Sequence, residues 1–194
     1  MIKIVQSTSK LIVITGLPAT GKTWLATEIS KSCNIPLFTK DELKIDLLEK
    51  LGTNDRSWDI KVGIAAVSLQ MKLAHQVLSK QIPVILESNY KQEFDAPLLL
   101  ELIARSSSDC LQFVCGAEGT VLIQRYKNRA HSDRNRSVLN EVNFNNIEEW
   151  RPKLIKGFDD PLELPGNTIR VDTTDFSKVD LEYIKASVRD FLST

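Results

Sequence analysis

A glycine-rich turn constrains this chain more than any other stretch. It reads Gly16-Leu17-Pro18-Ala19-Thr20-Gly21-Lys22-Thr23, and it stands between the apolar run Leu11–Ile14 and the helix-like run Trp24–Ile29. The pattern G-x-x-x-x-G-K-[ST] between a strand and a helix is typical of a P-loop, whose glycines let the backbone turn its N–H groups toward a polyphosphate. Lys22 can reach the outer phosphates, and the Thr23 hydroxyl can bind the Mg²⁺ that neutralises them. The alternative is a glycine turn before an ordinary helix.

Apolar and amphipathic runs alternate along the rest of the chain. We expect strands at 11–15, 35–39, 83–87, 110–115 and 167–172, and helices at about 22–32, from 40 onward, and at 58–79, 95–105, 120–129, 144–150 and 181–192. This alternation predicts an α/β fold in three layers, a P-loop NTPase fold with a mostly parallel five-stranded sheet and helices on both faces. Residues 1–194 are expected to form a single domain, with an arginine-bearing lid and an irregular segment over about 125–166.

The long helix at 58–79 carries an apolar stripe at steps of three and four residues. We interpret that stripe as core packing; its members are Val62, Ala66, Leu69, Leu73 and Val77.

The balance of charge limits the classes of partner. Acidic and basic residues number 25 each, so no general attraction to nucleic acid or to a membrane surface is expected, and stable nucleic-acid binding is not favoured. No apolar run is long enough to span a bilayer, and Met1–Val5 is too short for a signal peptide, so a cytoplasmic location without a membrane partner is expected.

The cysteines and histidines do not indicate a metal site. Cys33, Cys110 and Cys115 form no C-x-x-C pair, and we expect buried, reduced thiols. The two histidines, His75 and His131, are interpreted as structural or solvent-exposed.

Polar side chains follow the expected second strand, where a parallel sheet places its ligands. Asp41 is a candidate base, because a carboxylate beside bound phosphates can accept a proton from an attacking hydroxyl. The alternative is a helix N-cap, a role that Thr39 can also fill. Lys44 lies one turn further on and can hold an anionic substrate or be solvated.

The third strand ends in Glu87-Ser88-Asn89. An acid at this place is of the Walker-B type, so Glu87 can hold Mg²⁺ through water. Ser88 and Asn89 can contact substrate or phosphate, or they can form a simple turn.

The helix at 120–129 ends in a basic cluster that continues to Arg134 and Arg136. Such a run is often a solvated face, but Arg125 and Arg129 are one turn apart and share a face. Phosphoryl transfer needs cations that arrive as the site closes, so this pair is a candidate lid.

Together these features resemble the small P-loop kinases, in particular the phage-type polynucleotide 5′-kinase domain, the zeta-toxin kinases and the chloramphenicol phosphotransferases. The resemblance spans about 11–192 and implies Asp41 as general base and Arg125 with Arg129 as lid arginines. Polynucleotide kinases have arginine where this chain has Lys44, which cannot make the same bidentate contact. The usual Asp-x-Asn motif is here Glu87-Ser88-Asn89.

We therefore expect an ATP-dependent kinase that uses Mg²⁺ and acts on a hydroxyl. The acceptor is a hydroxyl-bearing small molecule or a nucleotide or polynucleotide end. The absence of an Asn-Lys-x-Asp guanine motif favours ATP over GTP. Two alternatives remain, a nucleotide-binding ATPase or switch without an acceptor, and a nucleotide-binding protein without turnover.

Overall fold

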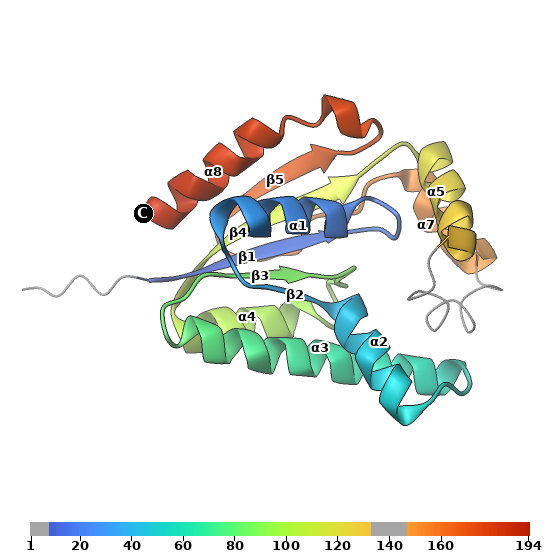
Figure 1. Ribbon diagram of the computed structural model, residues 1–194, viewed down its shortest axis with the longest axis horizontal. Helices are drawn as coiled ribbons and strands as arrows, with labels where there is room; N and C mark the ends of the chain where they lie inside the picture. Colours follow the sequence, from blue (N-terminus) through green and yellow to red (C-terminus); the bar gives the residue numbers. More distant parts are fainter. Residues whose placement is uncertain (1–7, 133–146) are drawn as a thin grey trace, which may run out of the picture.

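A single parallel sheet organises the protein (Figure 1). The structure is a computed structural model that describes residues 8–132 and 147–194. The strand order is β2-β3-β1-β4-β5, and every neighbouring pair is parallel. The expectation of a mostly parallel five-stranded sheet is confirmed, and its strands are β1 (Ser9–Gly16), β2 (Leu37–Thr39), β3 (Val84–Glu87), β4 (Ser108–Gly116) and β5 (Asn167–Asp172).

Helices cover both faces of the sheet, as the alternating pattern predicted. In Figure 1, α1 and α8 lie on one face, α3 and α4 on the other, and α5 and α7 at the carboxyl ends of the strands. A short 3₁₀ helix, Phe176–Lys178, follows β5. The helices are α1 (Lys22–Cys33), α2 (Lys40–Leu51), α3 (Arg56–Leu78), α4 (Ala96–Ser106), α5 (Gly119–Ser132), α7 (Ile147–Lys156) and α8 (Leu181–Ser193).

The central strand β1 divides the core into two layers. Leu11 and Val13 pack with α3 and α4, whereas Ile12 and Ile14 pack with α1 and α8. All four are fully buried. Burial of one such side chain stabilises the fold by roughly 1.5–3 kcal/mol. The apolar run before the P-loop therefore holds that loop at the centre of the sheet.

Capping side chains decide where the helices beside the site begin. The Thr39 hydroxyl accepts a hydrogen bond from the Glu42 N–H at 3.3 Å, so Thr39 caps α2. The Asp55 carboxylate accepts from the Trp58 N–H at 2.8 Å, and α3 therefore begins at Arg56, two residues earlier than expected. The capping alternative for Asp41 is not realised in this structure.

The second strand is shorter than the expected 35–39. It begins at Leu37, directly after Pro36. Proline has no N–H to give to a sheet, but the Pro36 carbonyl still accepts from the Ile85 N–H at 2.9 Å.

The apolar stripe on α3 is only partly the buried face. Val62 and Ala66 are buried, but Leu69, Leu73 and Val77 are only half-buried. The buried face of α3 continues instead through Val67, Gln70, Ala74 and Leu78. The expectation of core packing is wrong for Leu69 and Leu73, because the helix turns the polar Gln70 toward the sheet, whereas the half-buried Val77 does pack against the core.

The segment after α5 differs from the expectation in part. The helix expected at 144–150 continues to Lys156 with Pro152 inside it. Residues 144–146 lie outside the described residues, as do Arg134, Arg136 and the side chain of His131.

The cysteines are free, as expected. Cys110 and Cys115 are buried, and burial raises the pKa of each thiol to about 12. Cys33 is half-exposed, so the expectation of burial is wrong for it, because it lies at the last turn of α1. Within 8–132 and 147–194, no helix combines the length and the apolar character needed to cross a bilayer.

Candidate active site

Two glycines give the P-loop its conformation. Gly16 has φ +141°, and a side chain there would place its Cβ 2.1 Å from the carbonyl oxygen of Cys115. Gly21 has φ +78° and stands at the N-cap of α1. Both values lie in the region that glycine tolerates best, so the loop can bring its backbone N–H groups around a bound phosphate.

Threonine hydroxyls tie the P-loop to the neighbouring strands. Thr173, just after β5, donates to the Thr20 carbonyl at 2.7 Å and is 2.9 Å from the Gly116 carbonyl. Thr20 in turn donates to the Leu17 carbonyl at 2.8 Å. All of these contacts are buried, and they hold the loop in one shape before any ligand arrives.

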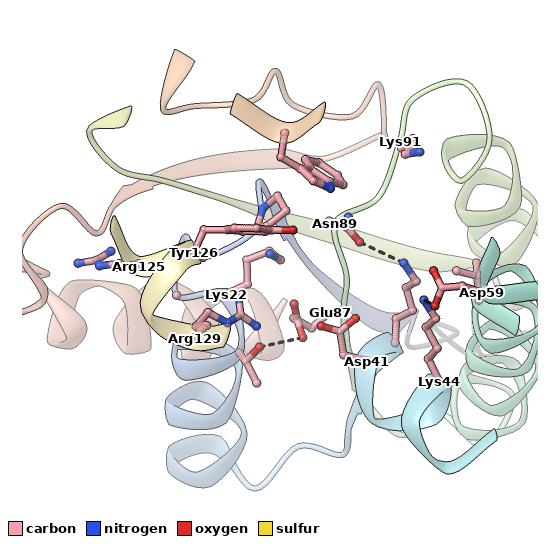
Figure 2. Close-up of a pocket in the computed structure, with 18 of the residues that line it drawn as sticks. Lys22, Asp41, Lys44, Asp59, Glu87, Asn89, Lys91, Arg125, Tyr126 and Arg129 are labelled. Carbon is pink, nitrogen blue, oxygen red and sulfur yellow. Dashed lines mark hydrogen bonds and ion pairs between the residues drawn. The ribbon is translucent and has the colours of Figure 1, made fainter. Parts of the chain in front are cut away.

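Lys22 and Thr23 begin α1 and face the cavity beyond the loop. The Lys22 ammonium donates to the Leu17 carbonyl at 2.9 Å. The Thr23 hydroxyl donates to the Glu87 carboxylate at 3.3 Å, which brings the end of β3 to the P-loop (Figure 2).

The oxygens of Thr23 and Glu87 fit Mg²⁺. This ion takes hard oxygen ligands and is usually held by one or two carboxylates together with substrate phosphates. No group of three His, Cys, Asp or Glu side chains that could hold a metal occurs within 8–132 and 147–194. A magnesium ion at this place would therefore depend on the nucleotide for the rest of its ligands.

One cavity of about 1240 Å³ joins the P-loop to the ends of β2 and β3. Known ligand sites have volumes of roughly 300–1,000 Å³, so this cavity has room for more than one small molecule. Side chains from α2, α3, α4, α5 and α7 complete its wall. Of the predicted site residues, it is lined by Pro18, Ala19, Gly21, Lys22, Thr23, Asp41, Lys44, Glu87, Asn89, Arg125 and Arg129.

Asp41 lies in the first turn of α2, where Thr39 already caps the helix. Its side chain is half-exposed. Figure 2 shows the Asp41 carboxylate pointing into the same part of the cavity as Glu87. The carboxylate is therefore placed to meet a second molecule in front of the phosphates.

Lys44 also lines the cavity, but its positive charge is paired with a carboxylate. Its ammonium lies 2.5 Å from the Asp59 carboxylate, and both side chains are almost fully buried. Arg56 approaches the other oxygen of Asp59 at 3.7 Å. Asp59 and Arg56 were not predicted as site residues, because Asp59 gains its place through the contact with Lys44 that joins α3 to α2, and Arg56 gains its place through Asp59.

The turn after β3 contributes one of its two candidates to the cavity. Asn89 lines it and accepts a hydrogen bond from the Lys40 ammonium at 3.2 Å. Ser88 is buried, and its hydroxyl lies 3.5 Å from the Asn89 side-chain oxygen. Ser88 therefore supports Asn89 rather than facing the cavity itself.

The two arginines of α5 point in different directions. Arg125 donates to the Thr173 and Thr174 carbonyls at 2.8 and 3.1 Å, and its guanidinium lies 4.3 Å from the Phe176 ring centre. Partial burial lowers the pKa of Arg125. Arg129 points toward the Lys22 and Glu87 side of the cavity in Figure 2.

A buried glutamine, which the sequence analysis missed, braces the strand ends. The Gln70 amide donates to the Phe38 carbonyl at 2.8 Å and to the Glu87 carbonyl at 3.0 Å. Its oxygen accepts from the Tyr90 hydroxyl at 2.7 Å. Burial raises the pKa of Tyr90 well above its ordinary value, so the phenol stays a donor at neutral and moderately alkaline pH.

Replacement of Tyr90 by phenylalanine is expected to lower the free energy of unfolding by about 1–2 kcal/mol, because the buried Gln70 oxygen then has no donor. Denaturant unfolding measures the loss. Tyr183→Phe is the control, because Tyr183 is 59% exposed. Equal free energies of unfolding for the two variants would contradict a stabilising role of the Tyr90–Gln70 hydrogen bond.

Comparison with known proteins assigns the family. A family model described as "AAA domain" matches residues 11–154, more than half of the chain. The chain belongs to this AAA-domain family. The match contains the P-loop, Asp41, Glu87 and both α5 arginines.

Solved structures share the fold of this AAA-domain protein. A protein of Chloroflexus aurantiacus, described as a "putative kinase", is 30% identical, with a TM-score of 0.84 over 97% of this chain and 98% of that chain. A gluconokinase from Sinorhizobium meliloti is 15% identical, with a TM-score of 0.50 over 97% and 94%. The Mycobacterium tuberculosis APS kinase, solved with AMPPNP and APS, is also 15% identical, with a TM-score of 0.53 over 96% and 99%.

The last two likenesses show the fold alone. A comparison with curated proteins finds no significant match. The chain is thus a P-loop protein with the architecture of the small kinases, and the narrower resemblance to the polynucleotide kinase, zeta-toxin and chloramphenicol phosphotransferase group stays a prediction.

Proposed function

We propose that this protein is an ATP-dependent phosphotransferase that moves the γ-phosphate of ATP to a hydroxyl group. The observation that carries the proposal is the shared cavity. The P-loop with Lys22 and the Asp41 carboxylate line the same cavity. The carboxylate is not used as a helix cap, because Thr39 caps α2. The 30% identical structure, described as a "putative kinase", points the same way.

The P-loop N–H groups and Lys22 bind the β- and γ-phosphates. Mg²⁺, held by Thr23 and through water by Glu87, would supply neutralisation of the phosphate charge. Lys22 must exchange its contact with the Leu17 carbonyl for a phosphate oxygen. That exchange is inexpensive in free energy, because a charge-assisted hydrogen bond to phosphate is the stronger of the two.

Asp41 orients the acceptor hydroxyl and takes its proton. The hydroxyl oxygen then attacks the γ-phosphorus, and the bond to the β,γ-bridging oxygen breaks as ADP leaves. Asn89 and Lys40 would hold the acceptor on the side away from the P-loop. Lys44 contributes to the same side of the cavity as part of its ion pair with Asp59.

The α5 arginines supply positive charge from the opposite side. Arg129 is assigned the direct contact with the transferring phosphoryl group, since it points to that side of the cavity. Arg125 adds charge at longer range and fixes α5 to the segment after β5 through two carbonyls. Such preorganised charge supplies a large share of the rate in phosphoryl transfer.

Transfer of labelled γ-phosphate to a panel of acceptors tests this function. The panel holds nucleosides, oligonucleotide ends, sugars, hydroxy acids and simple alcohols, and Lys22→Ala excludes contaminating kinases. Transfer to at least one acceptor by the unmodified chain, and not by Lys22→Ala, supports the proposal. Hydrolysis of ATP that no acceptor stimulates would instead support the ATPase or switch alternative, and the absence of any turnover would support nucleotide binding alone.

A further inference from the structure

A group of apolar side chains lines the cavity beyond Asp41. The group consists of Ile60 and Ile64 on α3, Phe94 in the turn before α4 and Leu98 in the first turn of α4. Their exposed fractions are 50%, 64%, 67% and 39%. Of the ten large apolar side chains that stand exposed in the described residues, five line this one cavity: these four and Phe176, which lies near the P-loop. Exposed apolar side chains that cluster in this way mark a binding site more often than scattered ones do.

The architecture of α3 explains why these side chains face the cavity. Ile60 and Ile64 are four residues apart and therefore share a helix face. The amino-terminal half of α3 pairs with α2 and extends past the carboxyl ends of the strands (Figure 1). The face is thus kept out of the sheet core and is presented to the cavity.

A cation lies beside this apolar wall. The Lys40 ammonium donates to the neutral Asn89 amide oxygen, and no carboxylate lies within ion-pair distance of it in the described part of the chain. The neighbouring Lys44 is different, because Asp59 neutralises it. Lys40 is therefore placed to pair with an anion that the ligand brings.

The wall also leaves room for a molecule of some size. Gly63 faces the cavity between the two isoleucines, and a Cβ there would meet nothing closer than 3.9 Å. The nearest atoms are the stems of Lys44 and Lys40. The cavity volume of about 1240 Å³ exceeds what one small ligand needs, so a nucleotide and an acceptor can be present together.

We propose that the phosphate acceptor is a small hydroxyl compound with an apolar body and one anionic group. The inference rests on the proposed kinase function. The body lies against Ile60, Ile64, Phe94 and Leu98, the anion meets Lys40, and the hydroxyl faces Asp41. A polyhydroxylated acceptor would place its hydroxyls against four side chains that cannot hydrogen-bond, so sugars and sugar acids are disfavoured.

A series of acceptors with matched charge tests the apolar body. It consists of hydroxyacetate, hydroxybutanoate and hydroxyhexanoate, each with its hydroxyl at the far end of the chain, and gluconate as the polyhydroxylated anion. We expect kcat/KM to rise by up to about fourfold for each added methylene that reaches the wall. Hexanediol tests the anion, and its kcat/KM should lie roughly ten- to a hundredfold below that of hydroxyhexanoate.

A matched pair of variants tests the wall. Leu98→Gln and Leu100→Gln lie on the same helix at 39% and 41% exposure, but only Leu98 lines the cavity. Leu98→Gln should lower kcat/KM for hydroxyhexanoate by roughly tenfold and should affect hydroxyacetate, which has no methylene chain to lie on the wall, far less, whereas Leu100→Gln should change neither. Thermal unfolding of both variants checks that they fold alike.

Each result decides the inference and can be told apart from a failure of the kinase function. Faster transfer to gluconate than to hydroxyhexanoate, or equal effects of the two leucine variants, would overturn the inference while the kinase function stands. Self-association that Leu98→Gln abolishes would assign the wall to a second copy of the chain and also overturn it. Transfer to no acceptor of either panel would overturn the kinase function, and the inference would fall with it.

Discussion

Asp41→Asn is expected to lower the rate of phosphate transfer by roughly 10²–10⁴-fold and to leave ATP affinity nearly unchanged. The amide has the shape of the carboxylate but cannot take a proton from the acceptor hydroxyl. Helix α2 should persist, because its cap is the Thr39 hydroxyl and not Asp41. The loss should therefore appear in kcat and not in the free energy of unfolding.

Asp46→Asn is the matched control for this experiment. Asp46 lies on the same helix but is exposed and outside the cavity, so the variant makes the same chemical change without touching the site. Single-turnover transfer measures the rate, and equilibrium binding of ATP measures the affinity. Equal transfer rates for the two variants would remove the base role from Asp41, and equal losses would assign the effect to helix α2 as a whole.

Much of the fold could be predicted because its signals are local. The run Leu11–Ile14 is apolar at every position, as a strand buried on both faces must be, and the motif after it fixes the strand-turn-helix unit. The order of strands and helices then implies the parallel sheet. The family match over 11–154 agrees with this architecture.

The interior of the site depends on contacts between distant segments, and these have no local signal. Gln70 reads as one polar residue on a long helix, yet it joins the ends of β2 and β3. The pairing of Lys44 with Asp59 likewise depends on how α2 and α3 cross. Sequence spacing could place Lys44 near the substrate, but it could not show that a carboxylate neutralises it.

The apolar wall was missed for a related reason. A helical stripe of isoleucine is ordinarily core, and the sequence does not reveal that α3 runs past the end of the sheet. Ile60 and Ile64 are exposed because the strands that would cover them end at Thr39 and Glu87. The length of α3 relative to the sheet, rather than its sequence pattern, therefore places these isoleucines on the cavity.

The α5 arginines should separate into two roles. Arg129→Ala is expected to lower kcat by about 10³-fold, because the transferring phosphoryl group loses its cation. Its free energy of unfolding should not change, since the side chain reaches into the cavity. Arg125→Ala should instead lower the free energy of unfolding by about 1–3 kcal/mol, because the Thr173 and Thr174 carbonyls lose a charged donor.

Lysine at each position separates charge from shape. Arg129→Lys should recover part of kcat, since a cation still reaches the phosphoryl group. Arg125→Lys should recover little stability, because a lysine lacks the guanidinium that both donates to the two carbonyls and lies over the Phe176 ring. Denaturant unfolding and steady-state kinetics on the same four variants measure both quantities. A loss of kcat without any loss of stability in Arg125→Ala would place Arg125, too, directly on the phosphoryl group, as the resemblance to the lid of the small kinases implies.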